Sequence, residues 1–135
     1  MSQENVEVVR RLSELLERRD WGGMTDLVDP NVELHGTVGG LEEGKILRGP
    51  SQISQAFETE DDEVWDEHRI EPQEFIDAGD RVVLLQREYQ RSKSGAEIVI
   101  DTAAILDLHD GRVVRIQGYM NPAEALESAG LSADT

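Results

Sequence analysis

The chain has 135 residues, 29 of them acidic and 13 basic, so its formal net charge is −16, and it contains no cysteine. That length suits one domain with a core of its own, and the charge disfavours binding to nucleic acid or to an anionic membrane surface. The missing cysteines exclude disulfides, thiolate nucleophiles and cysteine-ligated metals.

The first part of the chain carries helical periodicity. The apolar stripe of the first expected helix consists of Val6, Val9, Leu12, Leu15 and Leu16. Asp20 interrupts that pattern and can cap a shorter second helix. After it, 32–38 alternates like a short strand and 39–49 is a glycine-rich loop. Gly49-Pro50 then predicts the start of a third helix, because proline is favoured at the first helical position.

Seven of the ten residues 58–67, around the end of that third helix, are acidic. A solvated surface segment is one interpretation. The other is that these carboxylates oppose the helix dipole, loosen the last turn beside Trp65 and allow that end to move.

From about residue 67 onward the period changes to two, which predicts strands. Their expected ranges are 67–76, 81–91, 96–109 and 112–120. The turns between them are short, and Asp110-Gly111 in particular predicts a tight hairpin. Consecutive strands should therefore be antiparallel neighbours. The fold class predicted is α+β, with helices packed on one face of a curved antiparallel sheet. Asn121, followed by Pro122 and Glu124, is expected to cap a last helix.

Five stretches follow one another along the chain: SQENVEVVRRL, DLVDPNVELHG, ILRGPSQI, EPQEFIDAGDRVV and HDGRVVRIQGYMNPAEALESAGL. Their order resembles the SnoaL-like branch of the nuclear-transport-factor-2-like superfamily. The resemblance covers nearly the whole chain and implies that 1–135 is one cone-shaped domain, with the N-terminal helices on the concave face of its sheet. Relatives include ketosteroid isomerases, polyketide cyclases, limonene-epoxide hydrolases and non-catalytic binding domains, so the resemblance does not fix a reaction.

Strand alternation predicts which side chains face into the cone. In 97–109 the better inward set is Ile98, Ile100, Thr102, Ala104, Leu106 and Leu108, which leaves Asp101 outward. In 112–120 the apolar set is Val114, Ile116, Gly118 and Met120. We also expect a homodimer through the outer sheet face, from the resemblance and from the apolar residues Val99, Ala103, Ile105 and Val113 assigned to that face.

Two alternatives stay open for 81–91. If Val83 and Leu85 face inward, Arg87 and Tyr89 follow them into the cone and are its polar anchors for a ligand. If the set Val82, Leu84, Gln86 and Glu88 faces inward instead, Arg87 pairs with an acid on the outer face. The epoxide-hydrolase relatives use an arginine and two aspartates. Arg87 matches that arginine, but Tyr89 and Gly118 stand where the aspartates belong, so no inward carboxylate is expected.

The candidate catalytic residue is His68, which shares its face with Ile70 and suits proton abstraction. Trp65, His68, Arg87, Tyr89 and His35 are the candidate ligand-binding residues. A structural role is the competing interpretation for His35, His68 and Trp65. The histidines lack metal-site spacing, so no metal is expected.

We therefore expect the domain to bind a small, largely hydrophobic molecule, with isomerase-, cyclase- or hydrolase-type acid/base chemistry and no cofactor. The alternative is a non-catalytic ligand-binding or protein-interaction domain. A cytoplasmic location is expected, because the apolar runs are too short for a membrane span and the first residues lack a signal-peptide pattern.

Overall fold

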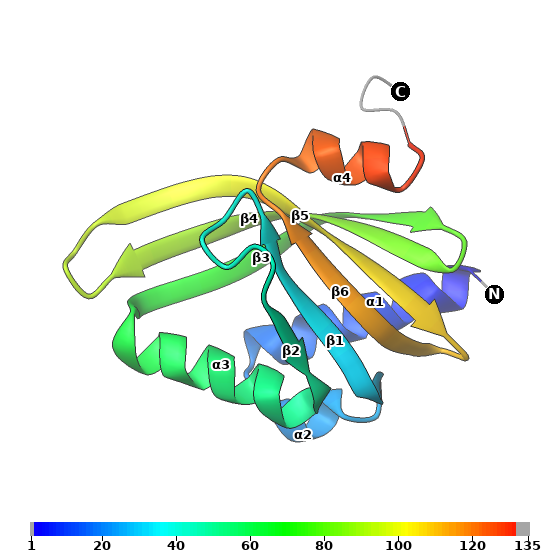
Figure 1. Ribbon diagram of the computed structural model, residues 1–135, viewed down its shortest axis with the longest axis horizontal. Helices are drawn as coiled ribbons and strands as arrows, with labels where there is room; N and C mark the ends of the chain where they lie inside the picture. The colour runs from blue at the N-terminus through cyan, green and yellow to red at the C-terminus, as the bar shows by residue number, and fades with distance from the viewer. Residues whose placement is uncertain (1, 132–135) are drawn as a thin grey trace.

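A computed structural model describes residues 2–131, in which four helices and six strands follow one another (Figure 1). In chain order they are α1 (Ser2–Glu17), α2 (Trp21–Met24), β1 (Val28–Val38), β2 (Ile46–Arg48), α3 (Gly49–Glu63), β3 (Trp65–Ala78), β4 (Arg81–Ser92), β5 (Glu97–His109), β6 (Arg112–Tyr119) and α4 (Pro122–Ser128).

One curved six-stranded sheet, in the order β2-β1-β6-β5-β4-β3, forms the body of the fold. The last four strands are the predicted antiparallel meander, and β1 pairs with β6 in parallel. The α+β class and the curved sheet are thus confirmed. Two predicted boundaries are wrong: β1 begins at Val28, and the loop 39–49 contains β2. A register shift between Val28 and Glu33 lets Pro30 lie within the strand.

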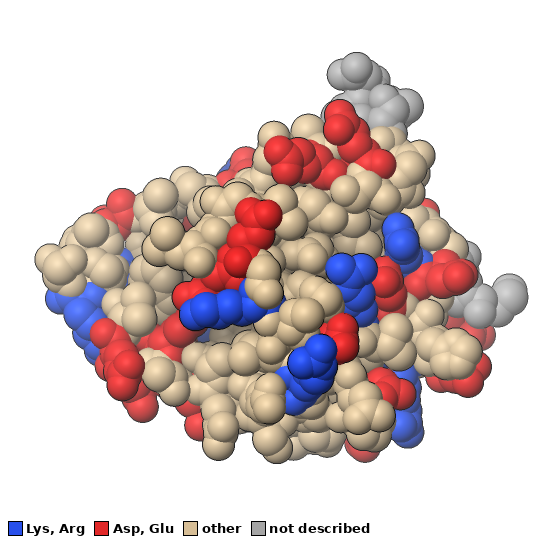
Figure 2. Space-filling view, viewed as in Figure 1, with Lys and Arg blue, Asp and Glu red and all other residues tan. Residues whose placement is uncertain are grey.

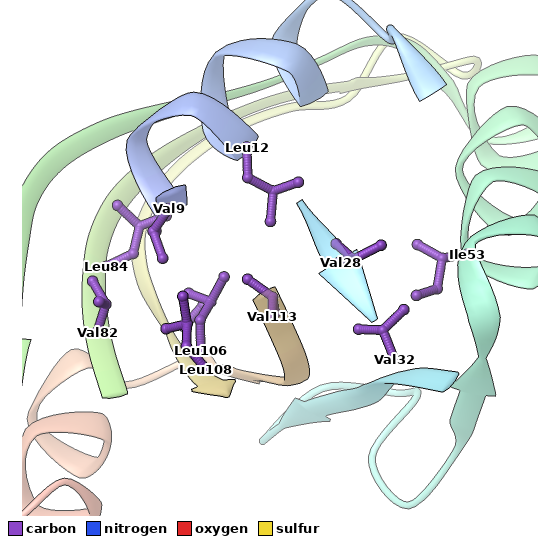
Figure 3. Close-up of a cluster of buried hydrophobic side chains, with 11 residues drawn as sticks. Val9, Leu12, Val28, Val32, Ile53, Val82, Leu84, Leu106, Leu108 and Val113 are labelled. Carbon is purple, nitrogen blue, oxygen red and sulfur yellow. The ribbon is translucent and has the colours of Figure 1, made fainter. Parts of the chain in front are cut away.

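Helices α1 and α3 lie on the concave side of the sheet, and α4 lies on the opposite side (Figure 1). The main core fills the space between the sheet and the two concave-side helices (Figure 3). Its buried members are Val9, Leu12, Val28, Val32, Ile53, Val82, Leu84, Ala104, Leu106, Leu108 and Val113. The predicted inward set of β5 is confirmed by three of these side chains.

The expected helix caps are present. The Asp20 carboxylate accepts a hydrogen bond from the Gly23 amide at 2.9 Å, and the Asn121 side chain accepts one from the Ala123 amide at 2.9 Å. Pro122 occupies the first turn of α4, as predicted. Capping alone accounts for Asn121, because its Oδ1 atom is used by the helix amide.

A second, smaller core lies between the outer sheet face and α4, and its buried members are Val83, Ala103, Ile105 and Ala125. Helix α4 therefore covers two of the four residues that were expected to need a dimer partner. Val113 belongs to the inner core, which corrects its predicted position, and Val99 is 58% exposed. Homodimer formation stays a prediction.

The charged side chains are mixed in sign over the face shown in Figure 2, with arginines and lysines set among carboxylates. Within residues 2–131, no helix is long and apolar enough to cross a membrane.

Candidate functional site

The two cores decide between the alternatives for β4. Val82 and Leu84 are part of the inner core, whereas Val83 is part of the core under α4. Alternation along the strand then directs Gln86 and Glu88 into the cone. The same alternation places Arg87 and Tyr89 on the outer face. The alternative in which Arg87 and Tyr89 face into the cone is therefore wrong.

Arg87 pairs with an acid on the outer face, as the second alternative stated. Its Nε atom lies 2.9 Å from Oδ1 of Asp101, and the two side chains are 43% and 59% exposed. The hydrogen bond and the charge of each partner raise the pKa of Arg87 and lower the pKa of Asp101. The outward position predicted for Asp101 is confirmed. The Arg69 guanidinium lies over the Tyr89 ring, 4.5 Å from the ring centre.

His35 also lies outside the cone. It follows Leu34, which packs against the inner core, and it is the strand partner of Gln117. Its Nε2 atom is 2.9 Å from Oε1 of Glu33, and this hydrogen bond lowers the pKa of Glu33. Three candidate ligand-binding residues, Arg87, Tyr89 and His35, are therefore separated from the concave face. Trp65 and His68 remain beside it.

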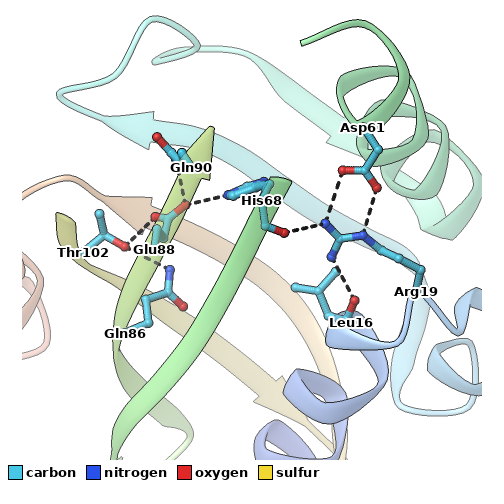
Figure 4. Close-up of polar contacts among 8 residues, drawn as sticks. All are labelled: Leu16, Arg19, Asp61, His68, Gln86, Glu88, Gln90 and Thr102. Carbon is cyan, nitrogen blue, oxygen red and sulfur yellow. Dashed lines mark hydrogen bonds and ion pairs between the residues drawn. The ribbon is translucent and has the colours of Figure 1, made fainter. Parts of the chain in front are cut away.

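A cluster of polar side chains occupies the concave face where β3, β4 and β5 run side by side (Figure 4). We call it the inner polar cluster, and it consists of His68, Gln86, Glu88, Gln90 and Thr102. Strand pairing brings its members together: His68 is opposite Gln90, and Gln86 is opposite Thr102.

Glu88 is at the centre of the cluster and accepts three hydrogen bonds. They come from His68 Nε2 at 2.9 Å, from the Thr102 hydroxyl at 2.6 Å and from Gln90 Nε2 at 3.2 Å. Gln86 in turn donates to the Thr102 hydroxyl at 3.1 Å. Burial raises the pKa of Glu88, but the hydrogen bonds from His68 and Thr102, with smaller contributions from the His68 charge and Gln90, outweigh it and leave the pKa below its ordinary value. Glu88 is therefore a carboxylate.

This carboxylate fixes the hydrogen positions of His68. An ionised carboxylate only accepts hydrogen bonds, so the Nε2 atom of His68 must carry the hydrogen. In the neutral ring Nδ1 then holds the lone pair. Nδ1 is buried and has no hydrogen-bond partner among the described residues, and the His68 side chain is only 8% exposed. In its neutral form the His68 ring therefore presents a basic Nδ1 atom whose orientation Glu88 fixes.

Glu88 was not among the site residues predicted from the sequence, although one alternative for 81–91 turned it inward. The pairing of β4 with β5 is the signal that identifies it, because opposite residues share a face: Glu88 is opposite Ile100, a member of the inward set.

Arg19 connects three elements behind His68. Its guanidinium donates to the His68 carbonyl at 3.3 Å, to the Leu16 carbonyl at 2.9 Å and to both Asp61 oxygens at 2.9 and 3.3 Å. Arg19 has a φ of +54°, in the left-handed region that non-glycine residues rarely adopt. These bonds stabilise that backbone and tie the end of α1 and the last turns of α3 to the start of β3 (Figure 4).

An apolar hollow of about 220 Å³ lies on the same side of the sheet. Leu12, Trp21, Val32, Ile53 and Ile116 are among its lining residues. The Trp21 and Phe57 ring centres are 5.8 Å apart, and the Arg19 guanidinium is 5.6 Å from the Phe57 ring centre. Phe57 and Arg19 thus link Trp21, at the hollow, to the backbone of His68.

A second hollow, of about 210 Å³, lies on the outer face near α4 and has a polar lining that includes Arg81, Asp107 and Arg115. Among residues 2–131, no group of three or more His, Asp or Glu side chains is arranged to hold a metal ion.

The SnoaL-like domain family matches residues 9–116 of the chain. The chain belongs to the SnoaL-like domain family. No curated protein matches it. This SnoaL-like domain also superimposes on solved structures over most of its length. A nuclear-transport-factor-2-like protein of unknown function from Burkholderia pseudomallei is 26% identical, with a TM-score of 0.75 and coverage of 92% of this chain and 95% of the other.

Two further structures are similar to this SnoaL-like domain. TerC, co-crystallised with polyporic acid, is 24% identical, with a TM-score of 0.76 and coverage of 94% and 98%. A protein with a ketosteroid isomerase-like fold from Catenulispora acidiphila, in complex with trimethylamine, is 18% identical, with a TM-score of 0.71 and coverage of 96% of both chains. At these identities the likeness establishes the fold.

Proposed function

We propose that this SnoaL-like domain binds a small, largely hydrophobic molecule in its cone and that His68 acts on it as a general base. The observation that carries the proposal is the buried His68–Glu88 pair at 2.9 Å, in which Nδ1 of His68 has no partner in the part of the chain that the structure describes. A buried polar atom without a partner costs about 1–3 kcal/mol, so folding stability gives no reason for it. A general base positioned to accept a proton from a ligand does give a reason for this unpartnered atom.

The proton step follows from the roles of the two side chains. A C–H bond of the ligand breaks, its proton goes to Nδ1 of His68, and the electron pair moves onto the adjacent carbonyl oxygen as an enolate. The imidazolium is stabilised by the Glu88 carboxylate, which orients the ring and takes no proton itself. Return of the proton to another carbon, or attack of the enolate on a second carbonyl, gives isomerase or cyclase chemistry respectively.

Binding of a small apolar molecule is supported by the inner face of the cone. Its apolar hollow of about 220 Å³ is somewhat below the usual range of small-molecule sites, about 300–1,000 Å³. A compound of about one ring is therefore the natural size. Two structures of similar fold hold small organic molecules, polyporic acid in TerC and trimethylamine in the Catenulispora acidiphila protein.

The experiment is hydrogen exchange of cyclohexanone in deuterated buffer, followed by NMR. We expect the protein to accelerate deuterium incorporation next to the carbonyl and His68→Gln to abolish the acceleration, since glutamine can keep a hydrogen bond to Glu88 but cannot take a proton. His35→Gln is the matched control, because His35 forms a His–Glu pair of the same 2.9 Å length outside the cone.

The non-catalytic alternative has its own support, because Nδ1 of His68 is closed off from solvent in this arrangement. If cyclohexanone shifts the methyl resonances of Ile53 and Ile116 but its deuterium exchange does not exceed that seen with His68→Gln, the domain binds the ketone without catalysis. Absence of both effects at millimolar ketone would contradict the proposed function.

A further inference from the structure

Two nitrogen atoms of neighbouring rings are buried and have no hydrogen-bond partner within residues 2–131: Nε1 of Trp65 and Nδ1 of His68. The ring centres are 5.3 Å apart and the planes are tilted by 42°. The two atoms have opposite hydrogen-bonding character. An indole N–H only donates, and Nδ1 of His68 accepts because Nε2 carries the hydrogen toward Glu88.

A hydroxyl group is the simplest single group that satisfies both atoms. Its oxygen accepts the Trp65 N–H and its hydrogen goes to Nδ1 of His68. The two rings are adjacent, with centres 5.3 Å apart, and two hydrogen bonds of about 2.9 Å that meet at one oxygen can join nitrogens of adjacent rings. We infer that Trp65 and His68 form a site for the hydroxyl group of an apolar alcohol, phenol or enol. The inference rests on the proposed function for the position of the ligand in the cone.

The surrounding charges select a neutral hydroxyl over a carboxylate. Glu88 lies directly behind His68, and Asp61 lies among further acids near the end of α3. Arg19 is the cation beside them, but its guanidinium is already bonded to Asp61 and to two carbonyl groups. A ligand carboxylate would therefore be repelled by Glu88 without gaining a free cation.

Entry of the hydroxyl requires Trp65 to turn, since neither nitrogen touches solvent. The local backbone favours such a turn. Trp65 is the first residue of β3, a register shift follows it before Glu67, and the preceding Val64 is 43% exposed. The last turn of α3 has no basic residue of its own, so its carboxylates oppose the helix dipole just before Trp65.

The test compares four ring compounds that differ in one group: cyclohexanol, methoxycyclohexane, methylcyclohexane and cyclohexanecarboxylate. Binding is followed through the Ile53 and Ile116 methyl resonances and through the indole N–H resonance of Trp65. Trp21, the other tryptophan of the chain, is the internal reference, assigned with Trp21→Phe. We expect cyclohexanol to bind on the order of 2- to 10-fold more tightly than the ether, which lacks the hydrogen for Nδ1. The ether should exceed the hydrocarbon by a similar factor, and cyclohexanecarboxylate should bind more weakly than cyclohexanol.

The indole resonance of Trp65 should move downfield with the alcohol and the ether but not with methylcyclohexane. Trp65→Phe should bring the ether down to the affinity of the hydrocarbon and weaken the alcohol, which keeps its bond to Nδ1 of His68, while methylcyclohexane binds as before. The inference would be overturned by equal affinities for the three neutral compounds, by a Trp65 resonance that does not move, or by preference for the carboxylate. The cone would then remain a ligand site that does not select a hydroxyl group. Failure of all four compounds to shift either the inner methyl groups or the Trp65 indole resonance would count against the proposed function itself.

Discussion

Replacing Glu88 by glutamine removes the charge that holds the inner polar cluster together. The carboxylate is 15% exposed and accepts from His68, Thr102 and Gln90. A hydrogen bond to a charged group contributes about 1.5–3 kcal/mol. Glutamine keeps one accepting oxygen but directs an NH₂ group at a former donor. We therefore expect Glu88→Gln to lower the free energy of unfolding at pH 7 by about 2–3 kcal/mol.

The pH dependence of this loss follows from the lowered pKa of Glu88. A carboxyl group whose folded pKa lies below its unfolded value stabilises the fold above the unfolded pKa. That contribution is lost as the pH falls through the folded pKa. The unfolded value for Glu is about 4.3. The gap between wild type and Glu88→Gln should therefore be full at pH 7 and shrink as the pH drops below about 4.

Urea unfolding followed by circular dichroism at pH 7 and pH 3.5 measures both quantities. Glu33→Gln is the matched control, since Glu33 accepts from His35 on the outer face and is more exposed; its effect at pH 7 should be clearly smaller. A Glu88→Gln gap that is the same at both pH values, or no larger than that of Glu33→Gln, would refute the reasoning.

Three further predictions concern the cap, the outer face and assembly. Asn121→Ala should lower the free energy of unfolding by about 1 kcal/mol, the usual loss of an N-cap, and Asn121→Asp should be close to neutral; urea unfolding measures both, and a neutral Asn121→Ala would contradict the cap. Arg87→Leu should leave the affinity for cyclohexanone unchanged, because Arg87 pairs with Asp101 outside the cone, and a large loss in an NMR titration would contradict that position. Sedimentation equilibrium should give a homodimer through the part of the outer face that α4 leaves open around Val99, and a monomer at micromolar concentration would exclude it.

The architecture followed from periodicity and turn chemistry. Helical spacing in the first part, strand alternation in the second and caps at Asp20 and Asn121 each agree with the structure. The concave face of β5 was predictable because its inward set is apolar along most of its length, whereas the outward set contains Asp101 and Asp107.

The face of β4 was not predictable from composition. Val82 to Leu85 is apolar on both sides, because the inner core takes one set and the core under α4 takes the other. The pairing of β4 with β5 decides which set of β4 side chains faces inward. A connection of 92–95 was predicted, but β4 ends at Ser92 and β5 begins at Glu97, so the connection is 93–96, with Arg91 opposite Glu97. The register fixes the two faces, because it places Glu88 opposite the inward Ile100 and Arg87 opposite the outward Asp101.

The state of the His68 ring tests the central claim most directly, because everything proposed for the cone depends on a basic Nδ1 atom oriented by Glu88. Long-range ¹H–¹⁵N NMR of the imidazole nitrogens distinguishes the two neutral forms, with His35 as an outer-face reference. We predict that neutral His68 carries its hydrogen on Nε2 and keeps Nδ1 unprotonated, and that Glu88→Gln disturbs this preference. A neutral His68 with its hydrogen on Nδ1, or the same mixture of forms with and without the Glu88 carboxylate, would contradict the account.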